Sequence, residues 1–302
     1  RRRNYLVACG LDTALSWLET LRCSEESIAY LASLGLFSAR LLAWLRAFRF
    51  TGDVHAVPEG TPVFPGEPLL EVVAPLPQAQ LVETALMNQV QLQTVAASKA
   101  ARVVAAAAGR TVIDFGARRM HGADAAIKVA RAAYVAWIDS TSNVLAGHLY
   151  WIPVAGTMAH SYVQAHPTQL ESFRAFASIH PRTVLIVDTY DTLEGVRDVV
   201  RLARELGPKF QVRGVRLDSG DLLALSTAAR RLLDDAGLAH VGIFASCGLD
   251  EDGIARLVGA GAPITGFGVG TAMGVSDDAP GLDIAYKLVS YAGRGRIKLS
   301  PG

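Results

Sequence analysis

The stretch Val215-Arg216-Leu217-Asp218-Ser219-Gly220-Asp221-Leu222 decides the fold class, because it joins a short apolar strand to a polar turn and the start of a helix. Its apolar run begins near Val212, and an amphipathic helix from Leu222 to Leu233 follows the turn. The same rhythm recurs after Gly109, and no repeated sequence accompanies it that would indicate a solenoid. Apolar runs begin near Val112, Ile152, Thr183, Val212, Val241 and Ile264. This part of the chain is therefore predicted to be a series of βα units.

Polar residues directly follow each of these apolar runs. The clusters are Asp114 to Arg119, Gly156 to Ser161, Asp188 to Asp191, Arg216 to Asp221, Ser246 to Gly248, and Phe267 to Thr271. In a barrel the carboxyl ends of all strands converge on one face, whereas an open doubly wound sheet concentrates its ligand at one switch point. Polar clusters at every strand end favour an α/β barrel, irregular or incomplete, over residues 109–302.

The first part of the chain has a different sequence pattern. Residues 11–50 carry helical periodicity, and from Thr51 short β-type segments alternate with Pro and Gly. Residues 78–108, rich in Ala, Leu and Val, indicate one or two long helices. We expect residues 1–108 to form a mixed helical and β-sandwich-like domain with a linking helix.

Composition excludes several classes of function. The chain has 302 residues, 51% of them hydrophobic, and a formal net charge of +1. That balance gives no broad field for nucleic acid or anionic membranes, and no apolar stretch is long enough to cross a bilayer. Three scattered cysteines match neither a disulfide framework nor a zinc ligand set, so a cytoplasmic protein without protein-ligated metal is expected.

Two glycine-containing segments suggest phosphate binding. Gly268, Gly270 and Thr271 are expected to follow a strand and expose N–H groups and a hydroxyl to an anion, and Ser246 to Gly248 offers a second such cradle. Either segment alone is as easily a tight turn that binds nothing. Two of them on neighbouring strands favour a ligand with two phosphates.

Acidic residues at the strand ends have competing explanations. Asp188 closes an apolar run that has little reason to end on an acid. Asp218 and Asp221 can hold ribose hydroxyls or Mg²⁺, although Asp221 can equally cap the helix that follows. Asp191 can cap the helix at Leu193.

Basic residues and one histidine complete the candidates. Arg118 and Arg119 suit a carboxylate or a phosphate, and one of the two is expected to pair with an acid such as Asp114 or Asp124. His160 can be a base, a ligand or a phosphoryl acceptor, but a lone histidine is most often a hydrogen-bonded core residue.

Taken together and in order, these segments resemble the nicotinate phosphoribosyltransferase family over nearly the whole chain. The matching strings are Phe50 to Asp53, Val57 to Phe64, Asp114 to Gly116, Thr141 to Gly147, Gly156 to Ser161, Val187 to Thr192, and Val215 to Leu222. No single string would suffice, whereas so many in register are highly specific. Cys247 stands where the family more often has glycine.

The resemblance implies a fold and a reaction. The fold is the irregular (β/α) barrel of the type II phosphoribosyltransferases with an N-terminal mixed α/β domain, working as a homodimer with shared active sites. The reaction joins nicotinate to phosphoribosyl pyrophosphate with ATP, giving nicotinate mononucleotide, pyrophosphate, ADP and phosphate for NAD biosynthesis. Mg²⁺ would arrive bound to substrate, and no prosthetic group is implied.

The resemblance also implies residue roles. His160 would be phosphorylated by ATP, with Asp188 near the phosphohistidine and its Mg²⁺, and Asp218 would join Arg216 in holding phosphoribosyl pyrophosphate. Arg118 would hold nicotinate. Further substrate contacts are expected from Ser142, Asn143, Ser246, Gly248, Gly268, Gly270 and Thr271.

Substrate choice is expected to depend on Asn143, because related nicotinamide enzymes carry an acid there and a carboxylate substrate would be repelled by it. Two alternatives stay open. One is a quinolinate phosphoribosyltransferase, whose dicarboxylate would call for a denser set of Arg and Lys. The other is a barrel that binds phosphoribosyl pyrophosphate or nucleotide without catalysis.

Overall fold

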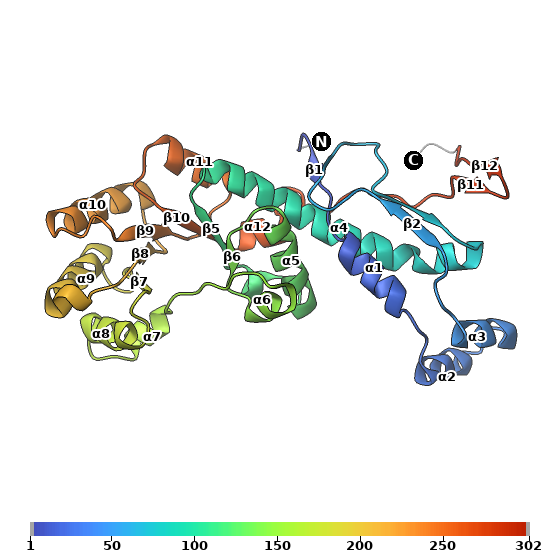
Figure 1. Cartoon of the computed structure of the whole chain (residues 1–302), viewed down its shortest axis with the longest axis horizontal. Helices are drawn as coiled ribbons and strands as arrows, with labels where there is room; N and C mark the ends of the chain where they lie inside the picture. The colour runs from blue at the N-terminus through green and yellow to red at the C-terminus, as the bar shows by residue number, and fades with distance from the viewer. Residues whose placement is uncertain (1–2, 300–302) are drawn as a thin grey trace. The chain divides into compact units, whose positions relative to one another are not determined.

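The computed structural model describes residues 3–299 and divides into two compact units. The larger, unit 2 (Ala96–Pro280), is built around six parallel strands (Figure 1). The strands are β5 (Thr111–Asp114), β6 (Ser140–Thr141), β7 (Val184–Ile186), β8 (Gly214–Leu217), β9 (Gly242–Ala245) and β10 (Gly266–Val269). Their order is β6-β5-β10-β9-β8-β7, so the last strand pairs with the first. That order is the order of a barrel and not of a doubly wound sheet.

The barrel is incomplete on one side. Thr141 of β6 makes one further parallel bridge, to Val154, and no pairing joins that segment to β7 among the described residues. The sheet is therefore a curled half-barrel, which confirms the predicted irregular α/β barrel.

Helices connect the strands, and several are fixed by side-chain caps at the predicted positions. Asp191 Oδ1 accepts a hydrogen bond from Glu194 N at the start of α9 (Thr192–Leu206), and Asp221 caps α10 (Leu222–Asp235) in the same way. The other helices of this unit are η1 (Ala117–Arg119), α5 (Ala123–Val135), α6 (Val144–Tyr150), α7 (His160–Gln164), α8 (Gln169–Ile179), η2 (Gly207–Lys209), α11 (Glu251–Gly259) and α12 (Thr271–Val275). Because each cap lies in the short turn after a strand, the start of the helix lies on the same face of the barrel as the end of the strand.

Unit 1 contains residues Arg1–Val95 and Gly281–Gly302, of which the structure describes residues 3–95 and 281–299. Its helices are α1 (Leu11–Thr20), α2 (Glu25–Ser33) and α3 (Ala39–Arg46). Its strands form separate two-stranded antiparallel ribbons: β1 (Leu6–Val7) with β3 (Pro62–Val63), β2 (Asp53–Ala56) with β4 (Leu70–Val73), and β11 (Ser290–Tyr291) with β12 (Arg294–Gly295). A small core of Ala14, Leu18, Val82 and Leu86 joins helix α1 to the first part of helix α4 (Leu76–Ala107).

The division of the chain differs from the expected boundary at residue 108. Helix α4 (Leu76–Ala107) is continuous, and the boundary between the units falls inside it. Residues from Gly281 onward belong to unit 1, where the Tyr286 hydroxyl donates a hydrogen bond to the Ala79 carbonyl at 3.1 Å. A contact over such a sequence distance leaves no local pattern from which to predict it. None of the helices in residues 3–299 is long and apolar enough to span a membrane.

Candidate active site

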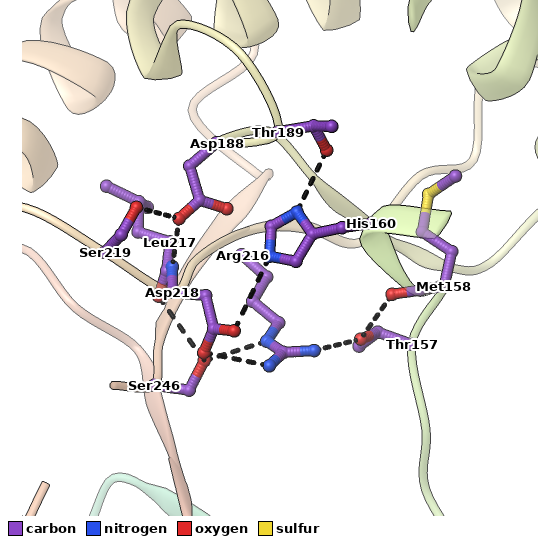
Figure 2. Close-up of polar contacts among 10 residues, drawn as sticks. All are labelled: Thr157, Met158, His160, Asp188, Thr189, Arg216, Leu217, Asp218, Ser219 and Ser246. Atoms are coloured by element: carbon purple, nitrogen blue, oxygen red, sulfur yellow. Dashed lines mark hydrogen bonds and ion pairs between the residues drawn. The ribbon is translucent and has the colours of Figure 1, made fainter. Parts of the chain in front are cut away.

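Polar side chains gather at the carboxyl ends of β7, β8 and β9, together with the segment that precedes α7 (Figure 2). Arg216 and Asp218 come from β8 and its end, and Ser246 directly follows β9. Of the six strand ends predicted to converge on one face, these contacts join the neighbouring three.

Arg216 connects the members of this cluster. Its Nε donates to Ser246 Oγ at 2.8 Å, its Nη1 donates to Thr157 Oγ1 at 2.8 Å, and its Nη2 lies 2.9 Å from Asp218 Oδ1. Its guanidinium also lies 5.2 Å from the centroid of the Phe115 ring. A guanidinium fixed on several sides presents its remaining N–H groups in a defined direction.

Asp218 remains ionised within the cluster. Burial alone would raise the pKa of Asp218, but the hydrogen bond from Ser246 Oγ and the positive charge of Arg216 outweigh burial and hold that pKa below its ordinary value. The site therefore keeps a negative charge beside the cation of Arg216.

Asp188 supports the loop that follows β8. Its Oδ2 accepts hydrogen bonds from Asp218 N at 2.8 Å and from Ser219 Oγ at 2.6 Å. Its Oδ1 is buried and has no hydrogen-bond partner among the described residues. A buried carboxylate oxygen without a donor is a place where a cation or a bound water fits.

His160, the first residue of α7, faces the same cluster. Its Nδ1 lies 3.1 Å from Thr189 Oγ1, and its Nε2 lies 3.7 Å from Asp218 Oδ2. The side chain is 42% exposed. The histidine is thus contacted at both ring nitrogens and yet partly exposed, unlike a core histidine.

A cavity of about 410 Å³ lies inside the barrel beside the cluster. Arg216, Ser246 and Thr157 line it at the carboxyl ends of the strands, and Phe115 and Gly268 line it from β5 and β10. A Cβ atom on Gly268 would come within 2.5 Å of the Phe115 ring, so glycine is needed for this ring to pack there. The volume suits a small organic ligand.

A second group of predicted residues lies at the ends of β5 and β6. Asn143 Oδ1 accepts a hydrogen bond from Ala146 N and so caps α6, while Ser142 N donates to the Asp114 carbonyl at 2.8 Å. Arg118 is exposed in η1 and has no side-chain partner among the described residues. Its guanidinium is therefore free to bind an anion.

The expected pairing of Arg118 or Arg119 with an acid is wrong. Asp124 pairs instead with Lys128 at 2.7 Å. Asp114 is buried and accepts hydrogen bonds from Thr141 Oγ1 at 2.7 Å and Gly116 N at 2.8 Å. Burial raises the pKa of Asp114 although both hydrogen bonds act to lower it.

The two glycine segments differ from the expected turns. Gly268 lies within strand β10, all of which is buried, so only Gly270 and Thr271 follow that strand. Gly248 lies in a loop with φ of 57°, and Cys247 before it has φ of 118°. Helix α11 begins at Glu251, where the side chain of Asp250 caps it.

Two acids have the capping role that the sequence offered them, and residues that the sequence did not single out join the site. Asp191 and Asp221 are helix caps. Thr157, Thr189 and Ser219 belong to the polar cluster, and Phe115 lines the cavity. Their signals in the sequence were a position soon after an apolar run and a place inside the strings that match the family. No group of three His, Cys, Asp or Glu side chains within residues 3–299 is arranged to hold a metal ion.

Comparison with known proteins assigns the chain to a family. Residues 1–91 match the model of the nicotinate phosphoribosyltransferase N-terminal domain, and residues 111–290 match the model of the nicotinate phosphoribosyltransferase family. The chain is 58% identical to nicotinate phosphoribosyltransferase pncB2 of Mycobacterium tuberculosis, over 99% of this chain and 65% of that protein. It is 42% identical to the nicotinate phosphoribosyltransferase of Bacillus subtilis, over 97% of this chain and 60% of that protein.

A solved structure supports the same family as the family models and the two bacterial relatives. Human nicotinic acid phosphoribosyltransferase superimposes with a TM-score of 0.85 at 30% identity, over 98% of this chain and 69% of the human chain. The chain thus spans 60% to 65% of the length of the two bacterial relatives. With two family models covering most of its residues, the chain belongs to the nicotinate phosphoribosyltransferase family.

Proposed function

We propose that this protein is a nicotinate phosphoribosyltransferase that makes nicotinate mononucleotide in the cytoplasm for NAD biosynthesis. The observation that carries the proposal is the joined set of Arg216, Asp218 and Ser246 beside a cavity of about 410 Å³, in a chain of this family. The substrates are nicotinate and phosphoribosyl pyrophosphate.

The chemistry requires charge stabilisation more than proton transfer. When pyrophosphate leaves the anomeric carbon, positive charge develops on the sugar and negative charge on the leaving group. The pyridine nitrogen is already a nucleophile, so no general base is needed. Arg216 has five N–H donors, of which three make the contacts described, so two remain for phosphate oxygens. The ionised Asp218 can accept hydrogen bonds from ribose hydroxyls.

We further propose that ATP hydrolysis is coupled to the reaction through phosphorylation of His160. The Nδ1 contact with Thr189 leaves Nε2 of this partly exposed side chain as the phosphoryl acceptor, and transfer forms an N–P bond as the bond to ADP breaks. Asp188 Oδ1, buried without a donor, fits a Mg²⁺ ion that arrives on the phosphates. Mg²⁺ would supply charge neutralisation of those phosphates.

Selection of nicotinate is proposed to depend on Asn143 and Arg118. Because Asn143 Oδ1 is committed to Ala146 N, its Nδ2 is the atom left for a ligand, and an N–H donor suits a carboxylate. The free guanidinium of Arg118 can bind the same carboxylate through two parallel hydrogen bonds. The Phe115 ring offers an apolar face for the pyridine.

A second copy of the chain is proposed as partner. Helices α5 and α6 and the residues after them carry exposed apolar side chains, including Trp137 (80% exposed), Val144 (71%) and Trp151 (90%). Exposed apolar side chains of this kind, of which Val144 directly follows Asn143, indicate a protein contact near the site. Replacing Trp151 with Asp should weaken self-association in analytical ultracentrifugation, and an unchanged mass would contradict this proposal.

The test of the reaction is an assay of purified protein with phosphoribosyl pyrophosphate, Mg²⁺ and one pyridine, with and without ATP, read by mass spectrometry. Nicotinate mononucleotide from nicotinate, stimulated by ATP, is expected. Carbon dioxide release from quinolinate would identify the quinolinate enzyme instead, and no product from any pyridine would indicate a barrel that only binds its ligand.

His160→Ala in the same assay separates coupling from transfer. This variant is expected to lose ATP stimulation while retaining basal synthesis. His166→Ala is the matched control, because His166 lies just after the same helix and contacts the Tyr162 carbonyl. Full stimulation in His160→Ala would overturn the phosphohistidine proposal.

A further inference from the structure

Lys99 lies in helix α4 with only 3% of its side chain exposed, outside the polar cluster described above. Its Nζ is 2.6 Å from Glu251 Oε2, 2.9 Å from Asp278 Oδ1 and 3.7 Å from Asp277 Oδ1. All of these residues belong to unit 2. One buried ammonium group thus contacts carboxylates from two separate segments.

Those carboxylates sit at the far ends of two loops that carry predicted substrate contacts. Glu251 begins α11, at the end of the loop that contains Ser246, Cys247 and Gly248. Asp277 and Asp278 follow α12, which starts directly after Gly270. The loop after β9, and the segment after β10 that contains α12, are therefore each joined to a strand at one end and in contact with Lys99 at the other.

Stability alone does not account well for this arrangement. Taking a lysine out of water is unfavourable, and apolar side chains of similar volume often stabilise such a position as well or better. Burial would lower the pKa of Lys99, but hydrogen bonds with Glu251 and Asp278 outweigh it and raise that pKa, so the ammonium stays charged. An ammonium group that donates to two carboxylates in different directions fixes geometry, which an apolar contact does not.

We propose that Lys99 is a positioning residue, which anchors the loops after β9 and β10 to helix α4 and so holds Ser246 to Gly248 and Gly270 to Thr271 in place for the phosphates of phosphoribosyl pyrophosphate. This inference rests on the proposed function for its ligand. The anchoring itself can be measured without any substrate.

The first experiment is hydrogen exchange of the whole chain, read by mass spectrometry. Lys99→Met should speed exchange in residues 246–252 and 270–279 and leave residues 111–118 unchanged. Glu251→Gln should affect only the first of these loops, and Asp278→Asn only the second. Because these two substitutions are milder, they test the anchoring by Lys99 even if the Lys99→Met variant does not fold.

Arg230→Met is the matched control. Arg230 donates to the carbonyls of Val241 at 2.7 Å and Leu238 at 3.0 Å, at the opposite end of β9 from Ser246. Loss of these bonds should lower the melting temperature without faster exchange in the two loops. Unchanged exchange in both loops of the Glu251→Gln and Asp278→Asn variants would overturn the proposal.

The second experiment compares Michaelis constants. Displaced phosphate contacts should raise the KM for phosphoribosyl pyrophosphate about 10-fold or more in Lys99→Met, with little change for nicotinate. A merely structural role would move both constants together, as expected for Arg230→Met, and that result would refute positioning. An inactive wild-type protein would instead refute the proposed reaction, while hydrogen exchange would still test the anchor.

Discussion

Arg216 Nη2 lies 2.9 Å from Asp218 Oδ1, and the two residues stand two positions apart at the carboxyl end of β8. Side chains two positions apart on a strand point to the same side. The strand itself therefore places a cation and an anion together at the edge of the cavity, and Ser246 from β9 joins them.

Replacing Arg216 with Lys keeps the charge but removes the planar fork that reaches Ser246, Thr157 and Asp218. Loss of one oriented donor at a developing negative charge typically lowers the rate about 100-fold or more. We expect a decrease of that order in kcat/KM for phosphoribosyl pyrophosphate, measured by steady-state formation of the mononucleotide.

The control for this change is Arg201→Lys. Arg201 is 53% exposed and pairs with Asp198 on the surface of α9, so kcat/KM should not change. An Arg216→Lys variant as active as the wild type would show that the guanidinium does not contact the leaving group.

The parts of this fold that were predictable from sequence are local. Asp191 and Asp221 cap helices because each stands between a strand and an amphipathic run, and the sequence offered this role for both, for Asp221 beside a ligand-binding one. The polar clusters after each strand converge because parallel strands share one carboxyl edge. Local pattern and barrel topology together therefore located Arg216, Asp218 and Ser246.

Other parts could not be predicted, for physical reasons. Strand β6 consists of Ser140 and Thr141 alone, too short and polar for a periodic signal. The hydrogen bond from Arg216 to Thr157 joins residues 59 positions apart. Whether Asn143 caps a helix depends on where α6 begins, which the sequence does not fix to one residue.

Ser246→Ala should make the protein more sensitive to acid. Burial tends to raise the pKa of Asp218, but Ser246 and Arg216 bring it below its ordinary value of 3.8. A carboxylate with a lowered pKa stabilises the fold above pH 3.8, and this stabilisation is lost as the pH falls through the folded-state value. Without the hydroxyl, the folded-state pKa moves up, so acid unfolding followed by circular dichroism should begin at higher pH.

Ser226→Ala is the control for that experiment. Ser226 is also buried, but its Oγ donates to the Leu223 carbonyl and touches no carboxylate in the described contacts. It should change stability about equally at all pH values. Equal shifts of the acid midpoint in both variants would show that Asp218 is not the cause of the acid sensitivity.

Cys247→Gly should stabilise the loop after β9. Cys247 has φ of 118°, a conformation that side chains with a Cβ rarely adopt. Relief of this strain exceeds the extra backbone entropy of glycine in the unfolded chain, for a gain of about 1 kcal/mol in the free energy of unfolding. Urea unfolding measures the change. Cys23→Gly, at a position without positive φ, should give no gain, and a loss in both variants would contradict the strain argument.

Asn143→Asp should change substrate preference without weakening helix α6. Aspartate caps a helix as well as asparagine does, so one carboxylate oxygen keeps the bond from Ala146 N. The other atom changes from an N–H donor to a negatively charged acceptor, which repels the carboxylate of nicotinate and accepts a hydrogen bond from the amide of nicotinamide. The ratio of kcat/KM values for nicotinate over nicotinamide should fall about 10-fold or more, with an unchanged melting temperature.

Asn143→Ser, which also caps but adds no charge, should lose activity with nicotinate without gaining nicotinamide turnover. If the aspartate variant keeps the wild-type ratio, Asn143 does not face the substituent on the pyridine ring, and discrimination must come from Arg118.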